Sequence, residues 1–240
     1  MTKFVFTCEH GGNKIPHEFK NLFESYHSLL KTHRAYDIGI LKIFNSFAHH
    51  FQSHNFHSEI SRLLIELNRS PHHKNLFSEI TKQLDSETKQ YIFNKYYLPY
   101  RTKVENDIKK EISNKHKVIH ISFHSFTPML NGIIRNADIG LLYDPKSKFE
   151  KDFCRQWCKE ILRYDRSLTV RFNYPYLGIA DGFTSYLRAK LGKNDYCGVE
   201  LEINQKLLTN SKEIKIISEI LKESFPIKFE NQKNDEKLNL

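Results

Sequence analysis

Three apolar segments of this chain carry a histidine or a carboxylate at or beside one end. These residues are His10, His124 and Glu202. Each segment is short and rich in β-branched and aromatic residues, which is typical of a strand. In an open α/β sheet, ligands bind beyond the carboxyl ends of the strands. Two histidines and a carboxylate gathered there can hold a metal ion that activates water, so a metal-dependent hydrolase is the first hypothesis.

A fourth apolar segment, 60–67, is bounded by arginines. If it is a strand, Arg62, Glu66 and Asn68 share one face, and Arg69 ends the strand. Buried arginines are costly unless they meet anions. A guanidinium group binds a carboxylate in a two-pronged fork, which suits an acidic substrate. Structural salt bridges are the alternative interpretation of the same residues.

The segment 198–203 predicts a strand with one polar face. Alternation places Glu200, Glu202 and Asn204 on the same side, opposite three aliphatic residues. A carboxylate beside a metal-bound water is the usual general base of metal hydrolases. The pattern alone does not decide which of the two glutamates has that role.

The elements that must position these residues alternate along the chain. Strands are predicted near 4–8, 60–67, 118–123, 139–143, 168–173 and 198–203. Helical spacing of apolar residues is found in 36–51, 104–112, 149–163 and 214–221. Pro99 is expected to break the stretch 86–114 into two helices. This order predicts an α/β fold with a mostly parallel sheet covered on both faces.

Composition limits the other classes of protein. The 240 residues are 39% hydrophobic and 27% charged, which suits one globular domain over 1–228 with a polar, frayed tail at 229–240. The formal charge of +9 comes from lysines spread along the chain, so a nucleic-acid partner is not predicted. Four scattered cysteines do not form a disulfide framework. Without a membrane-length apolar stretch or a signal-peptide core, we expect a cytoplasmic protein without a membrane partner.

Six motifs in order give the chain a resemblance to a known family. They are Glu9-His10-Gly11-Gly12, Arg62 with Leu67-Asn68-Arg69, Ser122-Phe123-His124-Ser125-Phe126, Gly140-Leu141-Leu142-Tyr143-Asp144, Asn173-Tyr174-Pro175-Tyr176 with Asp181-Gly182, and Glu200-Leu201-Glu202-Ile203-Asn204. Over about residues 4–208 this pattern resembles the N-formylglutamate amidohydrolase family. The resemblance implies the architecture of the zinc carboxypeptidases and aspartoacylase, which is a three-layer α/β/α sandwich around a mixed, mostly parallel sheet.

The resemblance also implies a zinc site. His10 and His124 look like zinc ligands. Zinc carboxypeptidases place a glutamate three residues after the first histidine, and here that position is Asn13. The third ligand is therefore expected to be Asp37, whose alternative role is an ordinary helix N-cap. Glu9 is the other candidate, although strand alternation points it away from His10.

Catalytic roles follow from the same resemblance. Arg62 looks like the group that polarises the scissile carbonyl, and Asn68 and Arg69 look like the clamp on a substrate carboxylate. Glu202 looks like the general base, with Glu200 as the alternative.

Three further positions bear on the substrate. Related enzymes usually carry aspartate where this chain has Glu66, which leaves the substrate open. Arg135 and Asp181 follow predicted strands and are expected to line the pocket.

These observations predict a zinc-dependent amidohydrolase that cleaves an N-acyl amino acid such as N-formylglutamate. Its partner would be a small molecule bearing a carboxylate, and another divalent transition metal could replace zinc. Two alternatives remain. One is a related zinc amidase or carboxypeptidase-like enzyme acting on another acyl-amino acid or a cell-wall peptide. The other is a non-enzymatic basic α/β binding module.

Overall fold

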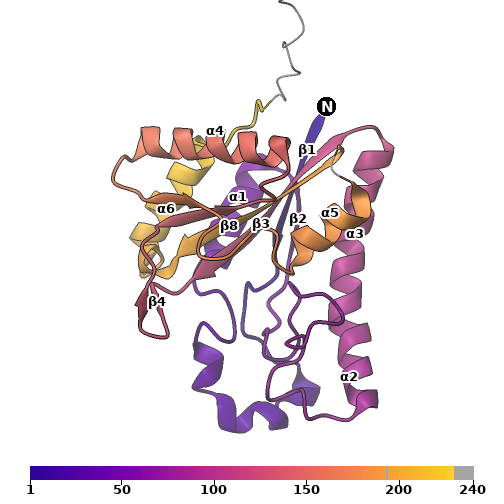
Figure 1. Cartoon of the computed structure of the whole chain (residues 1–240). Coiled ribbons are helices and arrows are strands. Elements are labelled where there is room, and N and C mark those ends of the chain that lie inside the picture. Colours follow the sequence, from indigo (N-terminus) through magenta and orange to yellow (C-terminus); the bar gives the residue numbers. More distant parts are fainter. Residues whose placement is uncertain (193, 230–240) are drawn as a thin grey trace, which may run out of the picture.

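The computed structural model describes residues 1–192 and 194–229 and has a six-stranded sheet at its centre (Figure 1). The strands are β1 (Thr2–Cys8), β2 (His54–His57), β3 (Lys117–Phe126), β6 (Ile139–Leu142), β7 (Val170–Phe172) and β8 (Tyr196–Asn204). Their order is β2-β1-β3-β8-β6-β7, and every neighbouring pair is parallel except β6 and β8. The predicted mixed, mostly parallel sheet is confirmed.

Helices cover both faces of this sheet and make three layers (Figure 1). The first face packs against α1 (Ile40–Phe51), α4 (Lys148–Tyr164) and α6 (Ser211–Glu223), and the second against α3 (Leu98–Ser113) and α5 (Phe183–Leu191). Helix α1 begins after Gly39, whose φ of 82° lies in the left-handed region that favours glycine. No helix in the described part of the chain is long and apolar enough to span a bilayer.

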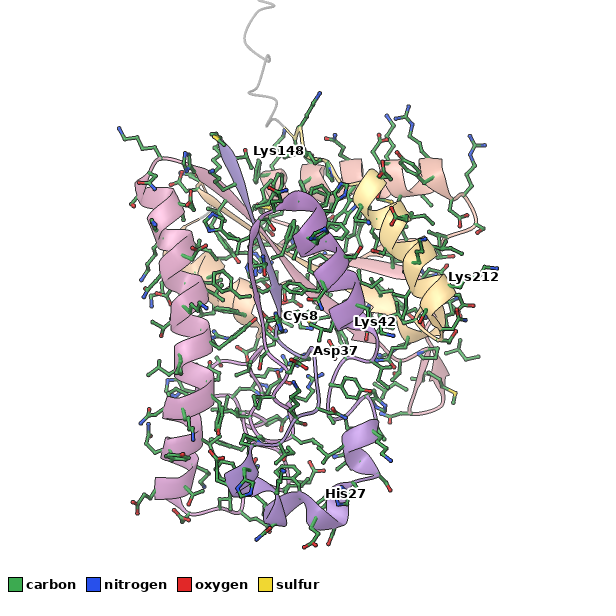
Figure 2. All side chains as sticks on the ribbon, turned by 180° about the vertical axis from the view of Figure 1, so that it is seen from behind. Cys8, His27, Asp37, Lys42, Lys148 and Lys212 are labelled. Carbon is green, nitrogen blue, oxygen red and sulfur yellow. The ribbon has the colours of Figure 1, made fainter. Side chains whose placement is uncertain are left out.

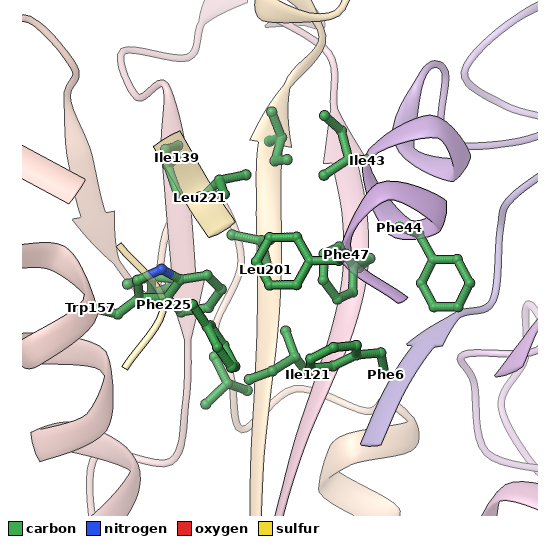
Figure 3. Close-up of a cluster of buried hydrophobic side chains, with 14 of the residues drawn as sticks. Phe6, Ile43, Phe44, Phe47, Ile121, Ile139, Trp157, Leu201, Leu221 and Phe225 are labelled. Carbon is green, nitrogen blue, oxygen red and sulfur yellow. The ribbon is translucent and has the colours of Figure 1, made fainter. Parts of the chain in front are cut away.

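The core between the first face and its helices is strongly aromatic (Figure 3). Phe47 packs edge-to-face on Phe225, with ring centroids 5.4 Å apart, and Trp157 meets the same phenylalanine at 5.1 Å. Such edge-to-face pairs add to the stabilisation that burial already gives. Phe229 is also buried here, so the tail expected from 229 does not begin there, and the rest of that predicted tail (230–240) lies outside the described residues.

A smaller lobe lies beyond the carboxyl ends of the parallel strands. It comprises residues 11–37 and 58–97 and has its own apolar core. It contains helix α2 (Ser86–Ile92), several 3₁₀ turns and long irregular segments. From Ser86 to Ser113 the chain is helical throughout, with a π-helical turn before α3, so Pro99 sits in the first turn of α3 and does not interrupt the run.

The strand predicted over 60–67 is wrong. The structure has a series of turns there, and Ile60 makes one isolated bridge to Lys14. Leu63, Leu64 and Ile65 are all buried, so the side chains do not alternate between a core face and a solvent face. The lobe core surrounds this segment on several sides, and a continuous apolar run of this length does not distinguish a buried strand from other buried backbone.

The second face of the sheet is polar in its middle. His120 is fully buried, with Nε2 2.7 Å from the Thr7 hydroxyl and Nδ1 2.7 Å from the Tyr196 hydroxyl. A neutral imidazole has one donor and one acceptor, and both hydroxyls can complement it. Burial is the main reason that the pKa of His120 falls to about 4.

The lowered pKa of His120 predicts a pH-dependent stability. Between pH 6.5 and pH 4 the unfolded chain binds a proton that the folded chain excludes. Stability is therefore full above pH 6.5 and is lost as the pH falls, by up to about 3 kcal/mol from this group. Urea unfolding at pH 7 and pH 4.5 should show a smaller loss for His120→Gln than for the wild type. The exposed His72→Gln control should behave like the wild type, and an equal loss in all three proteins would contradict the assignment.

Candidate metal centre

The site lies where the sheet meets the smaller lobe. The strands β1, β3 and β8 are parallel neighbours, so their carboxyl ends meet at one edge of the sheet. Strand pairing sets His124 directly beside Glu202. Figure 2 shows Asp37 just beyond Cys8, the last residue of β1, and so between the sheet and the lobe.

A tight turn carries His10 out of β1. The backbone N–H of Gly11 donates to the Ser58 carbonyl at 2.9 Å. A Cβ atom at Gly12 would lie 2.7 Å from the carbonyl oxygen of Glu59, so only glycine lets the turn press against that segment. The backbone N–H of Asp37 donates to the His10 carbonyl at 3.0 Å, which fixes Asp37 at the end of β1.

His10, Asp37 and His124 form a buried group that could hold a metal ion, with one ligand atom from each within 4.8 Å of the others. Asp37 Oδ2 lies 2.9 Å from His124 Nδ1 and 3.5 Å from His10 Nδ1. Tetrahedral zinc with bonds of ~2.1 Å separates its ligand atoms by ~3.4 Å, so the spacing fits such an ion. His10 Nδ1 is buried and makes no hydrogen bond to the described residues, which is the condition of a ligand atom without its metal.

The two histidine rings are held in the same way. In each ring Nδ1 faces Asp37, and Nε2 faces a different buried carboxylate. The partner of His10 Nε2 is Glu66 Oε1, and Glu9 Oε2 lies 3.3 Å from His124 Nε2. Metal-binding histidines characteristically give their second N–H to such a carboxylate, which orients the ring and makes it a stronger ligand.

Arg62 bridges the carboxylates of Glu66 and Asp37. Its Nε donates to Glu66 Oε2 at 2.8 Å, its Nη2 contacts the same oxygen, and its Nη1 donates to Asp37 Oδ1 at 3.3 Å. The backbone N–H of Asn68 donates to the other Glu66 oxygen at 3.0 Å. Glu66 is thus fixed from three directions while it holds His10.

The carboxylates of this group are ionised. Burial alone would raise the pKa of each, but hydrogen bonds and nearby positive charges reverse the effect: His124 lowers the pKa of Glu9 to about 2, His10 and His124 lower the pKa of Asp37, and Arg62 and His10 lower the pKa of Glu66. A histidine must be neutral to bind a metal ion, so in a loaded site Glu9, Asp37 and Glu66 would bring three negative charges and Arg62 one positive charge, a net charge of −2 before the ion is counted. A divalent cation would neutralise it.

A polar pocket opens in front of these residues. Its lining residues are His10, Asp37, Arg62, Asn68, Arg69, His124, Ser125, Tyr176, Leu177, Ala180, Asp181, Glu200 and Glu202. The structure therefore brings the predicted site residues together, apart from Arg135. Arg135 lies behind the wall, where its Nη2 donates to the Tyr176 hydroxyl at 3.2 Å.

The two glutamates of β8 differ in their surroundings. Glu200 accepts a hydrogen bond from the Thr184 hydroxyl at 2.8 Å. Glu202 is buried, and its Oε2 has no hydrogen-bond partner among the described residues. Burial raises the pKa of Glu202 to about 8, with the negative charges of Asp37 and Glu200 adding to the effect. Glu202 thus lines the pocket beside His124, and one of its carboxyl oxygens has no partner among the described residues.

Asn68 and Arg69 are both held by neighbouring segments. Asn68 Oδ1 accepts from the backbone N–H of Phe183 at 2.7 Å, at the start of α5. Arg69 Nη1 donates to the carbonyl of Asp181, whose carboxylate accepts from the backbone N–H of Ser70 at 3.0 Å. These bonds tie the loop after Glu66 to the loop before α5 and so shape one wall of the pocket.

The geometry also bears on alternatives that the sequence left open. Glu9 faces Nε2 of His124, whereas Asp37 faces Nδ1, and Glu9 is not part of the group of three residues that could hold a metal ion. Asp37 is not a helix cap, because Gly39 is the N-cap of α1. Asn13 donates to the Leu30 carbonyl at 2.7 Å, inside the lobe.

The contact between Glu66 and His10 is the feature that sequence reasoning missed. The assumed strand placed Glu66 on the same face as Arg62 but gave no link to His10. The available signal was the position of Glu66 between Arg62 and the pair Asn68 and Arg69, because those residues already looked like parts of a binding site.

Comparison with solved structures agrees with this fold. A crystal structure of a gene product from Agrobacterium tumefaciens is 26% identical, with a TM-score of 0.77 over 93% of this chain and 88% of that one. An N-formylglutamate amidohydrolase from Ralstonia eutropha is 16% identical, with a TM-score of 0.67 over 92% of this chain and 90% of that one. No curated protein matches the sequence.

Fold and site define the class: a three-layer α/β protein with a polar pocket and a possible metal site at the carboxyl ends of its parallel strands. The family model for N-formylglutamate amidohydrolase matches residues 2–209. The chain belongs to that family, and it is a hydrolase that acts on amide C–N bonds.

Proposed function

We propose that this chain is a zinc-dependent amidohydrolase that removes the acyl group from an N-acyl amino acid such as N-formylglutamate. The buried His10 Nδ1, which faces Asp37 and His124 without a hydrogen bond in the described residues, carries the proposal. The net charge of the surrounding group supports it, because buried carboxylates in such excess are costly without a cation. Two histidines and one carboxylate form a common zinc set for catalysis.

The residues of the pocket suit hydrolysis of an amide. A bound zinc ion would lower the pKa of a water ligand and polarise the substrate carbonyl. Glu202 takes the proton from the attacking water through its free oxygen and returns it to the leaving nitrogen. Arg62 faces the same pocket and stabilises the negative charge that develops on the carbonyl oxygen.

Positive charge in the pocket supports a substrate with a carboxylate. Asn68 and Arg69 line the pocket, and they hold the carboxylate so that the amide is oriented for attack. Arg135 acts from behind Tyr176 and favours a second negative group near the mouth. An acidic amino acid such as glutamate would use both features.

A substrate panel with metal analysis tests this function. We expect one equivalent of zinc per chain and hydrolysis of N-formylglutamate in preference to N-formylleucine, because only the first has a side-chain carboxylate. N-acetylglutamate and a muropeptide test the acyl group and the cell-wall alternative. Removal of zinc by a chelator should abolish turnover, and added zinc should restore it. Absence of bound zinc and of hydrolysis after zinc is added would contradict the proposal and favour a binding module.

A further inference from the structure

Glu9 is a buried charge that the proposed reaction does not use. Its side chain is fully buried, directly after β1. Among the described residues, no lysine or arginine makes an ion pair or hydrogen bond with it. Its contacts are the hydroxyls of Ser122 and Tyr100 and the ring of His124. A buried carboxylate is costly unless hydrogen-bond donors surround it, so the ring N–H of His124 is the partner to consider.

We propose that Glu9 is a positioning residue which, together with Ser122, fixes the tautomer of His124 and strengthens its hold on the metal. The inference rests on the metal centre of the proposed function. His124 Nε2 lies 2.9 Å from Ser122 Oγ, and the Ser122 hydroxyl donates to Glu9 Oε2 at 2.6 Å. The carboxylate also faces Nε2 directly at 3.3 Å.

The donors and acceptors around Nε2 of His124 show which ring nitrogen carries the proton. Ser122 has one hydroxyl hydrogen and gives it to Glu9, so its oxygen can only accept from His124. An ionised carboxylate also only accepts. Both groups therefore require a proton on Nε2. In a ring that binds a metal ion, the lone pair would then lie on Nδ1, the atom 2.9 Å from Asp37 Oδ2.

One contact competes with this assignment. The amide nitrogen of Asn68 lies 3.3 Å from His124 Nε2, and its orientation is set by the bond from the Phe183 N–H to the amide oxygen. An amide nitrogen donates, so it would favour a lone pair on Nε2. The shorter bond to Ser122 and the negative charge of Glu9 outweigh it, because a charged acceptor makes the stronger hydrogen bond.

The end of β1 positions two consecutive residues, Glu9 and His10, that act at the same metal centre. His10 is a ligand, and the residue before it supports the other ligand from the neighbouring strand β3. Tyr100 donates to the second Glu9 oxygen at 3.1 Å and fixes the carboxylate from the α3 side. The arrangement thus separates two tasks, since Glu9 Oε2 acts on His124 and Glu9 Oε1 is anchored to α3.

The first test is zinc affinity, measured by competition with a chromogenic chelator on the full chain. Glu9→Gln keeps the shape but removes the charge, and its Kd for zinc should rise about 10- to 100-fold, the range for outer partners of metal ligands. Ser122→Ala should raise the Kd less, because Glu9 still faces Nε2. Tyr100→Phe is the matched control, because it loses a bond to the same carboxylate but does not contact His124. A Glu9→Gln Kd equal to that of the wild type would overturn the inference.

The second test uses the wild-type protein, so its result does not depend on the folding of a variant. Long-range ¹H–¹⁵N spectra of the zinc-loaded wild type should show the His124 proton on Nε2. A proton on Nδ1 would overturn the inference even if zinc binds tightly. Failure of the wild type to bind zinc would contradict the proposed function instead.

Discussion

Replacement of Glu202 by glutamine should lower the rate of amide hydrolysis by about 10²- to 10⁴-fold, the usual contribution of a general base. Glutamine has nearly the same shape, so the strand and the pocket should persist. The loss follows because an amide cannot take the proton of the attacking water. The free Oε2 of Glu202, in the wall beside His124, is the observation behind this expectation.

Glu200→Gln is the matched control for this experiment. Glu200 lies two residues earlier on the same face of β8, but its Oε1 is bonded to the Thr184 hydroxyl. We expect a much smaller effect on turnover. Zinc content and thermal stability should be measured for both variants, so that a loss of metal is not mistaken for a loss of the base. Full turnover by Glu202→Gln would remove it from the mechanism, and a large loss in Glu200→Gln alone would exchange the two roles.

Replacement of Asp37 by asparagine should weaken zinc binding by more than about 100-fold, beyond the range for outer partners of metal ligands. Asp37 Oδ2 is the atom that both histidine Nδ1 atoms face. The amide keeps one oxygen, which can accept either from Arg62, now bonded to Oδ1, or from the backbone N–H of Ser125, now bonded to Oδ2, so thermal stability should be measured beside zinc binding. Zinc is measured by elemental analysis after dialysis and by chelator competition.

Asn13→Ala provides the control for Asp37→Asn. Asn13 occupies the sequence position at which zinc carboxypeptidases place a glutamate ligand, and here it bonds to Leu30 inside the lobe. The variant should keep one equivalent of zinc. His10→Ala should lose the metal, as Asp37→Asn does. Stoichiometric zinc in Asp37→Asn would show that the third ligand is another residue.

The sheet could be predicted because its strands follow simple patterns. In β8, apolar residues such as Leu201 face the aromatic core, and Glu200 and Glu202 face the opposite side. Such alternation is a local property that a sequence displays directly. The ends of the strands then indicated where His10 and His124 would meet, because parallel neighbours share one edge of a sheet.

The smaller lobe could not be predicted in the same way. Its fold depends on contacts between distant segments, such as the bond from the Arg62 N–H to the Ala35 carbonyl at 3.0 Å. An apolar run in such a place has no period that identifies its structure. The position of Glu66 against His10 follows from that packing, which is why the pattern could name Glu66 as unusual but not assign its partner.

The centre lies between the sheet and the smaller lobe, so a bound ion would link the hydrophobic core of the sheet to that of the lobe. His124 belongs to the sheet, whereas Asp37 and the Arg62–Glu66 pair come from segments that pack in the lobe. An ion that binds only the assembled form adds its binding free energy to the stability of that assembly. Loading with zinc should therefore protect the backbone amides of residues 58–70 from hydrogen exchange more than those of α4, which packs on the first face of the sheet and does not line the pocket.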